Sequence, residues 1–371
     1  MSEIFQPFYL ATFSFLFFIS LIIHFLFRII LRRLKVVDVP DGEKKIHRML
    51  VPISGGISIM FSLVVIGALY LALSYSQFLE IFFETESLKL STWNLDFKTG
   101  ILFGITGLIV AAVSFFDDVL ELPVWFRFMT LVLCSGMVIG VSGLSLTSLG
   151  NLFGLGEIKL NTILSPIFTI FCVVGVANAF NWIDGLDGLF STQVLIVSSA
   201  IFYFIGGNGI FFTIFLIAFL PYLLMNLSFF GKKNRVFMGD HGSMAIGYTA
   251  AWFLISAAEF EVINPMTAPW LIAMVLLNAL RVMFKRALLG VSLYRSDREH
   301  IHHFFLENGY SKGESLLIIT LISIFLTFVG VMFEINQISD YISFYFFISA
   351  FIIWSFLSSN LKGRFKNKKL F

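Results

Sequence analysis

Charge is scarce in this chain: only 13% of its 371 residues are Asp, Glu, Lys or Arg, whereas soluble globular domains carry about a quarter. Hydrophobic residues make up 58% of the sequence, and the mean hydropathy is +0.91. These values exclude a water-soluble globule. They predict an integral membrane protein.

Cysteine and the signals of a cleaved leader are also lacking. The two cysteines, Cys134 and Cys172, lie in apolar runs with no CxxC pair and no His at ligand spacing, so we interpret them as packing residues. The first apolar segment has no basic region before it and no small-residue cleavage site, and it ends at Arg32-Arg33. This pattern indicates a retained membrane span rather than a signal peptide.

Long apolar runs recur along the whole chain. A helix needs about 20 mostly apolar residues to cross the hydrocarbon core of a bilayer. The sequence therefore predicts one all-α polytopic membrane domain over residues 1–371, with about eleven transmembrane helices. We place them at residues 8–31, 51–74, 99–116, 124–141, 162–180, 188–206, 209–226, 237–257, 266–284, 315–334 and 339–359.

The distribution of Lys and Arg predicts the orientation, because cytoplasmic loops are enriched in these residues. With a periplasmic N-terminus, every Lys and Arg except Lys89, Lys98 and Lys159 falls at the cytoplasmic side. Eleven spans then place the C-terminus in the cytoplasm. We expect a multi-pass membrane protein.

The most informative stretch is residues 178–188, in which Asn178, Asn181, Asp184 and Asp187 follow one another at intervals of three. On a helix, residues three apart are surface neighbours, so the four side chains would form one stripe. Such hard oxygen ligands suit Mg²⁺ or Mn²⁺. A capped turn is the alternative interpretation, but carboxylates at the edge of a membrane span are costly without a function.

Two further acidic sites adjoin predicted spans. Asp117 and Asp118 end the third span directly after two Phe residues, with Arg127 nine positions on; a stop-transfer pair is the alternative, but a carboxylate at the apolar boundary favours a function. Residues 237–243 open the eighth span, where a helix N-terminus can bind an anion. Helix capping by Asp240 or Ser243 is the alternative there.

Cationic and histidine-rich loops complete the set. Lys44, Lys45, His47 and Arg48 form a cluster suited either to anchoring at anionic lipid or to phosphate binding. Arg298 precedes His300, His302 and His303, which suggest either a zinc site or hydrogen bonding to a sugar or diphosphate; no Cys or carboxylate at zinc spacing accompanies them, which favours the second.

These residues fall in segments near 32–50, 117–127, 178–188, 228–243 and 285–314, all on the cytoplasmic face of the predicted topology. That arrangement describes a shallow cytoplasmic active site. An ion-coupled transporter is the alternative from another class, because intramembrane carboxylates also mark ion pathways. Transporter sites, however, usually lie near the bilayer midplane.

The motifs as a set resemble the polyprenyl-phosphate N-acetylhexosamine-1-phosphate transferases. The resemblance runs from Asp38-Val-Pro through Gly55-Gly56, Asp117-Asp118, residues 178–188 and Phe237-Met-Gly-Asp to Asp297-Arg-Glu-His-Ile-His-His. The last motif is similar to the bacterial branch that transfers GlcNAc-1-phosphate to undecaprenyl phosphate. The resemblance implies an enzyme of the bacterial inner membrane, with UDP-GlcNAc as donor, UMP as product and Mg²⁺ or Mn²⁺ as cofactor. It would catalyse the first lipid-linked step of O-antigen or enterobacterial common antigen synthesis.

The resemblance also implies roles for individual residues. The catalytic carboxylates would be Asp117, the candidate base towards the lipid phosphate, with Asp118, Asp184 and Asp187. Metal binding would fall to Asn181 and Asp240, and nucleotide binding to Phe237, stacked on uracil, with Asn178 and Asp187. Sugar and diphosphate contacts would come from Arg127, Arg298, His300, His302 and His303, and lipid head-group contacts from Lys44, Lys45, His47 and Arg48. No nucleic-acid partner is implied, and a homo-oligomer is allowed.

The sequence departs from the family pattern at three places. Asn278 stands where relatives usually carry Asp, His241 follows Asp240 where a small residue is common, and Leu293-Tyr294 replace a Pro-Phe pair. We expect the last two to flank the nucleotide and sugar pockets, which leaves another UDP-N-acetylhexosamine, such as a 6-deoxy sugar or UDP-GalNAc, as an alternative donor. Direct attack by the lipid phosphate and a covalent aspartyl-phosphate route also both remain open.

Overall fold

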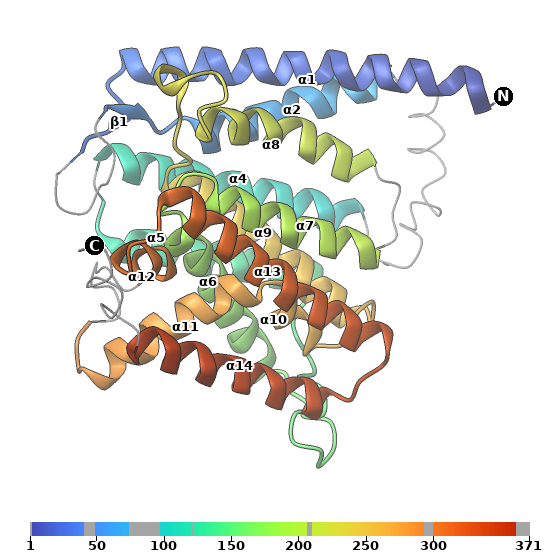
Figure 1. The fold of residues 1–371 in the computed structure, drawn as a ribbon. Coiled ribbons are helices and arrows are strands. Elements are labelled where there is room, and N and C mark those ends of the chain that lie inside the picture. The colour runs from blue at the N-terminus through green and yellow to red at the C-terminus, as the bar shows by residue number, and fades with distance from the viewer. Residues whose placement is uncertain are drawn as a thin grey trace.

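The computed structural model describes residues 2–40, 49–73, 97–120, 122–205, 210–292 and 300–360, and it is a bundle of helices (Figure 1). The helices are α1 (Ser2–Arg33), α2 (Gly55–Leu73), α4 (Phe97–Leu120), α5 (Val124–Ser142), α6 (Leu164–Ile183), α7 (Leu189–Ile205), α8 (Ile210–Asn226), α9 (Asp240–Glu259), α10 (Thr267–Leu271), α11 (Ala273–Leu288), α12 (Ile301–Glu307), α13 (Lys312–Ile335) and α14 (Asp340–Asn360). A short antiparallel pair joins β1 (Val37–Asp38) to β2 (Val51–Pro52).

Within the described residues, six helices are long and apolar enough to cross a membrane, which confirms a polytopic membrane protein of the all-α class. They cover Ala11–Arg33, Lys98–Leu120, Val124–Ser142, Leu164–Ile183, Lys312–Ile335 and Asp340–Ser359, and three shorter apolar helices cover Gly55–Tyr70, Leu189–Phe204 and Phe212–Asn226. The count of eleven spans and the orientation of the termini stay predictions. Cys134 in α5 and Cys172 in α6 are both free thiols.

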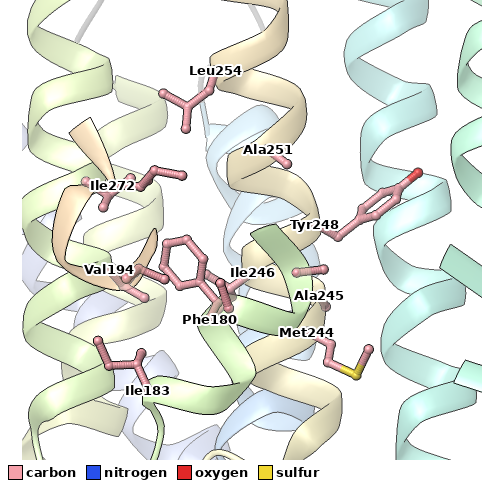
Figure 2. Packing of buried hydrophobic residues seen from close by; sticks show 14 of the residues in the cluster. Phe180, Ile183, Val194, Met244, Ala245, Ile246, Tyr248, Ala251, Leu254 and Ile272 are labelled. Carbon is pink, nitrogen blue, oxygen red and sulfur yellow. The ribbon is translucent and has the colours of Figure 1, made fainter. Parts of the chain in front are cut away.

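Helix α9 is the centre of the bundle and the most thoroughly buried of the described helices. It packs most extensively against α6 and α4, and its residues Met244, Ala245 and Tyr248 are almost inaccessible. Figure 2 shows Ile246 of α9 beside Phe180 of α6, while Tyr248 and Met244 point to the opposite side of α9. A helix surrounded by protein does not need an apolar outer face, so α9 accommodates Asp240 and His241, which are costly on a lipid-facing surface.

Glycine allows α6 and α9 to approach closely. A Cβ atom on Gly247 would lie 2.7 Å from the Cβ of Phe180 and 3.0 Å from the Cα of Ala177, so only hydrogen fits there. Small residues at helix contacts permit such packing in membrane proteins. The contact brings the C-terminal end of α6 beside the N-terminal end of α9.

The segment before α9 is held by backbone hydrogen bonds to the start of α2. The Phe237 N–H donates to Pro52 O (2.9 Å), while the N–H groups of Gly55 and Gly56 donate to Phe237 O (2.8 Å) and Met238 O (3.0 Å). These bonds satisfy donors that the first turn of α2 would otherwise leave unpaired. They fix residues 237–239 as a rigid edge next to the ends of α6 and α9.

The predicted continuous span at 266–284 is wrong in one respect: it is divided into α10 and α11. Ile272, with φ −114° and ψ 22°, leaves the helical conformation between them. The Thr327 hydroxyl of α13 donates to Leu271 O at 3.4 Å. Side chains of neighbouring helices commonly satisfy the backbone groups that such a break releases.

Candidate active site

A cavity of about 640 Å³ lies where α6 ends and α9 begins. Eight of the site residues that the sequence singled out line it, which is most of those in the described part of the chain. The lining residues are Val37, Asp38, Val39, Ile53, Asp118, Asn181, Asp184, Gly185, Leu186, Asp187, Asn226, Phe237, Gly239, Asp240, His302, His303 and Lys312. The predicted convergence of distant loops is therefore found in the described part of the chain.

The stripe predicted at residues 178–188 is divided by the end of α6. Asn178 and Asn181 lie on the helix, which ends at Ile183, and Asp184 caps it with non-helical backbone angles (φ −78°, ψ 59°). Gly188, at φ +81°, turns the chain into α7, and its N–H donates to Asn226 Oδ1 at 2.7 Å. The prediction of one continuous helical face is thus wrong, although Asn181, Asp184 and Asp187 still share the cavity wall.

Asn178 lies in a smaller pocket of about 80 Å³, next to the cavity. This pocket is lined by Val124, Arg127, Phe128, Asn178, Asn181 and Trp182, so Asn181 borders both spaces. The Asn181 side-chain amide donates to the Ser243 hydroxyl of α9 at 3.0 Å. That bond uses Nδ2 and leaves Oδ1 of Asn181 as an acceptor.

Asp184 is the carboxylate most perturbed by its surroundings. Burial, together with the negative charges of Asp240, Asp187, Asp118 and Asp38, raises its pKa from 3.8 to about 7. A cation bound in the cavity would neutralise the neighbouring carboxylates and so remove their contribution to the raised pKa.

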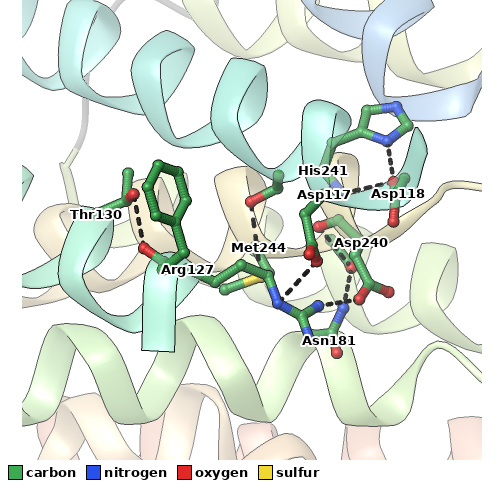
Figure 3. Close-up of polar contacts among 11 residues, drawn as sticks. Asp117, Asp118, Arg127, Thr130, Asn181, Asp240, His241 and Met244 are labelled. Carbon is green, nitrogen blue, oxygen red and sulfur yellow. Dashed lines mark hydrogen bonds and ion pairs between the residues drawn. The ribbon is translucent and has the colours of Figure 1, made fainter. Parts of the chain in front are cut away.

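Arg127 joins two carboxylates from different helices. Its Nε lies 2.9 Å from Asp117 Oδ2, and its terminal nitrogen is paired with Asp240 Oδ2. Figure 3 shows the guanidinium between the two acidic side chains. Asp117 is 7% exposed and does not line the cavity, whereas Asp240, at 42%, faces it.

The N-terminus of α9 is occupied by a carboxylate of the protein itself. The backbone N–H of His241 donates to Asp118 Oδ2 at 3.3 Å, and the N–H groups of Gly242 and Ser243 return to Gly239 O at 3.2 Å. The expectation of free N–H groups awaiting an external anion is therefore not met at these three positions. Gly239 occupies the N-cap position, where no side chain caps the helix. The Ser243 hydroxyl donates to Gly239 O and Asp240 O.

Arg235 is paired with a carboxylate of the cavity wall. Its terminal nitrogen lies 3.2 Å from Asp187 Oδ2, and its Nε donates to the Ser228 hydroxyl at 3.0 Å. The buried Asn226 holds the two neighbouring loops by accepting from Gly188 N and donating to Val236 O at 3.0 Å. These bonds position Asp187 against the cavity.

The three histidines of the segment 300–303 lie in two different places. His302 and His303 line the cavity, while His300 lies 6.2 Å from the Trp182 ring, between ring centroids. Asn278 accepts the Ile301 N–H at 2.8 Å. Burial and the neighbouring His303 and His300 lower the pKa of His302 well below its usual range, which keeps that ring neutral.

The sequence did not predict a role for several residues that line the cavity. Asp38, Asn226 and Lys312 line the wall; Asp38 lies in the Asp38-Val-Pro motif, which was a signal of its importance. The residues Lys44, Lys45, His47, Arg48, Leu293, Tyr294 and Arg298 lie outside the described residues. His241 does not line the cavity, so its side chain is not placed to select a donor sugar.

The donor set fits Mg²⁺ better than zinc. Asp118, Asp184, Asp187, Asp240 and Asn181 offer hard oxygen atoms, and Mg²⁺ is usually held by one or two carboxylates together with substrate phosphates. Within the described residues, no three His, Cys, Asp or Glu side chains form a metal-binding group. A three-histidine zinc site is therefore not supported there, whereas a Mg²⁺ site completed by substrate is compatible with the geometry.

Comparison with known proteins agrees with the motifs. The family model for glycosyl transferase family 4 matches residues 100–258. The chain is 30% identical over 350 residues to an undecaprenyl-phosphate alpha-N-acetylglucosaminyl 1-phosphate transferase of Yersinia pestis, covering 92% of this chain and 89% of that protein. A protein of that name from Escherichia coli O157:H7 is 30% identical, with 90% and 86% covered.

A shorter match has a higher sequence identity. The Pasteurella multocida protein of the same name is 38% identical over 144 residues, or 38% of this chain and 40% of that protein. The long matches extend the similarity well beyond the region that the family model covers. The chain is therefore a member of glycosyl transferase family 4, within the group of polyprenyl-phosphate N-acetylhexosamine-1-phosphate transferases.

Proposed function

We propose that this protein transfers N-acetylglucosamine-1-phosphate from UDP-GlcNAc to undecaprenyl phosphate, giving undecaprenyl-diphospho-GlcNAc and UMP. The observation that supports this most directly is the cavity at the ends of α6 and α9, where carboxylates and an amide meet beside Phe237, in a chain whose relatives bear the corresponding name. Family membership argues against the transporter alternative.

The proposed location is the cytoplasmic face of the bacterial inner membrane, at the first lipid-linked step of O-antigen or enterobacterial common antigen synthesis. The Lys and Arg distribution supports the orientation. The acceptor is a lipid, so an active site at helix ends lets its phosphate meet a soluble nucleotide sugar without crossing the bilayer.

In the proposed reaction, a phosphate oxygen of the lipid attacks the β-phosphorus of UDP-GlcNAc in line. A new P–O bond forms to the lipid phosphate, the bond from the β-phosphorus to the bridging oxygen breaks, and UMP leaves with that oxygen. Phosphoryl transfer depends mainly on positioning and charge stabilisation. Direct attack requires no carboxylate nucleophile, and Asp117 is already paired with Arg127.

The side chains of the site suit separate tasks in this reaction. Asn181 and Asp240 would hold Mg²⁺, which supplies neutralisation of the diphosphate charge when bound. Phe237 would stack on the uracil, and Arg127, in the smaller pocket beside Asn178, would contact a phosphate. His302 and His303, which also line the cavity, would face the sugar and diphosphate.

Release of UMP tests the proposal. Detergent-purified protein with Mg²⁺ should release UMP from UDP-GlcNAc only when undecaprenyl phosphate is present. Release from UDP-GalNAc or a 6-deoxy UDP-sugar instead would change the donor alone. Absence of release with all of these donors would overturn the proposal.

Isotope exchange separates the two chemical routes. Labelled UMP should not exchange into UDP-GlcNAc in the absence of lipid, if attack is direct. Exchange without the lipid acceptor would support an aspartyl-phosphate intermediate.

A further inference from the structure

His241 is the buried neighbour of Asp240, and its ring points at Asp118 rather than into the cavity. Its side chain is 1% exposed, and its Nδ1 lies 2.6 Å from Asp118 Oδ2. The same carboxylate oxygen accepts the backbone N–H of His241 at 3.3 Å. In Figure 3 the imidazole lies beyond Asp118, on the side away from Arg127.

Two groups of His241 meet the same carboxylate oxygen. The backbone N–H donates to Asp118 Oδ2, and a proton on Nδ1 lets the ring donate to it as well. Hydrogen bonds to a carboxylate are shorter and stronger than those between neutral groups. Both donors of His241 therefore converge on one oxygen of Asp118.

The imidazole is confined by two glycines and a phenylalanine. A Cβ on Gly56 would lie 2.5 Å from the ring Cδ2, and a Cβ on Gly239 would lie 2.5 Å from both Cε1 and Nδ1. The Phe115 ring meets the imidazole edge to face, with 5.3 Å between centroids. The ring consequently has one orientation, which the surrounding backbone imposes.

The confined ring determines the orientation of the Asp118 carboxylate. Asp118 lines the cavity and has its Oδ2 engaged by His241, which leaves Oδ1 for whatever occupies the cavity. We propose that His241 is a positioning residue of the transferase, which fixes the Asp118 carboxylate so that a single oxygen faces the substrate. This inference rests on the proposed function and deepens it, because it assigns a role to the residue that departs from the family pattern.

Two substitutions separate the hydrogen bond from the packing. His241→Leu fills much of the ring volume without a donor, whereas His241→Asn places an amide N–H near the position of Nδ1 with less volume. We expect His241→Leu to lower kcat for UMP release by about 10- to 100-fold, the usual effect of removing a partner that orients a site residue. The KM for UDP-GlcNAc should stay within about twofold in both variants, and His241→Asn should recover most of kcat.

An unchanged kcat in His241→Leu would overturn the proposal, because it would show that the contact has no part in turnover. Equal losses in the Leu and Asn variants, with equal falls in the thermal unfolding midpoint, would show a packing role only.

A second readout requires no activity. The thermal unfolding midpoints of wild type, Asp118→Asn, His241→Leu and the double variant form a double-mutant cycle. We expect the leucine substitution to lower the midpoint more when Asp118 is present, because it then leaves a carboxylate without its donor. Additive effects would contradict the contact itself, whereas failure of wild type to release UMP from any donor would contradict the proposed function and leave this cycle interpretable.

Discussion

Arg127 and Asp240 form an ion pair between the first turn of α5 and the first residue of α9, 113 positions apart in the sequence. The same guanidinium contacts Asp117 of α4 at 2.9 Å through Nε. One planar cation therefore holds carboxylates from two other helices, at the boundary between the cavity and the smaller pocket. The two acidic residues depend on Arg127 for their arrangement.

Replacing Arg127 by Lys should lower the rate of UMP release by roughly tenfold or more. A lysine keeps the charge but is a single point donor, whereas the guanidinium contacts Asp117 and Asp240 with different nitrogen atoms at once. Initial rates with saturating UDP-GlcNAc and undecaprenyl phosphate measure the effect. Arg33→Lys, at the exposed end of α1, is the matched control, and equal rates in both variants would show that the bridge is not needed.

The raised pKa of Asp184 predicts how stability depends on pH. The free carboxyl ionises near 3.8, whereas the folded protein holds its proton up to a pKa of about 7. Between these values the native state binds more protons than the unfolded state, so stability falls as pH rises. Without divalent cations, the thermal unfolding midpoint of the wild type should decrease from pH 5 to pH 8.

Asp184→Asn is the corresponding test, because an amide has no proton to lose. Its unfolding midpoint should vary less over the same pH range and should exceed that of wild type at pH 8. Glu157→Gln provides the control, since Glu157 is a surface carboxyl whose pKa is lowered rather than raised. If Asp184→Asn keeps the full wild-type slope, another group is responsible.

Asn278 should tolerate replacement by Asp but not by Leu. Its Oδ1 accepts the Ile301 N–H at 2.8 Å, and a carboxylate oxygen can do the same. Leucine would leave that buried donor unpaired, at a cost of about 1–3 kcal/mol, and would release the segment that holds His302 and His303. We expect Asn278→Asp to release UMP within about threefold of wild type and Asn278→Leu to show a higher KM for UDP-GlcNAc; similar kinetics in the two variants would contradict the anchoring role.

The sequence predicted which residues meet because their convergence follows from topology alone. Alternate helix ends share one membrane face, so Asp118, Asn181, Asp187, Asp240 and Phe237 could be brought together without knowing any distance, and the structure places them around one cavity. The interval of three predicted a helical face that includes Asp184 and Asp187, but α6 ends at Ile183. Local turn geometry at the glycines, rather than the interval of three, decides where Asp184 lies.

Other features depend on packing that one-dimensional patterns do not contain. Asp117 and Asp118 are adjacent in sequence, yet successive residues on a helix point about 100° apart, so one contacts Arg127 and the other His241. Which carboxylate faces the cavity follows from how α4, α5 and α9 are rotated against one another. At the break near Ile272, the Thr327 hydroxyl of another helix donates to Leu271 O, a contact that local sequence does not reveal.

Magnesium should stabilise the wild-type protein through the same carboxylates that it needs for activity. A ligand that binds only the folded state at 100 times its Kd stabilises it by about 2.7 kcal/mol. Adding MgCl₂ after chelation should therefore raise the thermal unfolding midpoint and restore UMP release together. Calcium prefers more ligands and longer distances than Mg²⁺, and it should restore less activity.

Asp240→Asn distinguishes a bound ion from general screening of the acidic cavity. The substitution removes one charged ligand while Arg127, Asp117 and Asp184 remain, so the upward shift with MgCl₂ should shrink or disappear. Asp340→Asn changes a carboxylate that accepts the Asn151 N–H far from the cavity, and this variant should retain the full shift. Because screening by salt acts on all exposed charges, equal shifts in both variants would mean that Asp240 holds no ion.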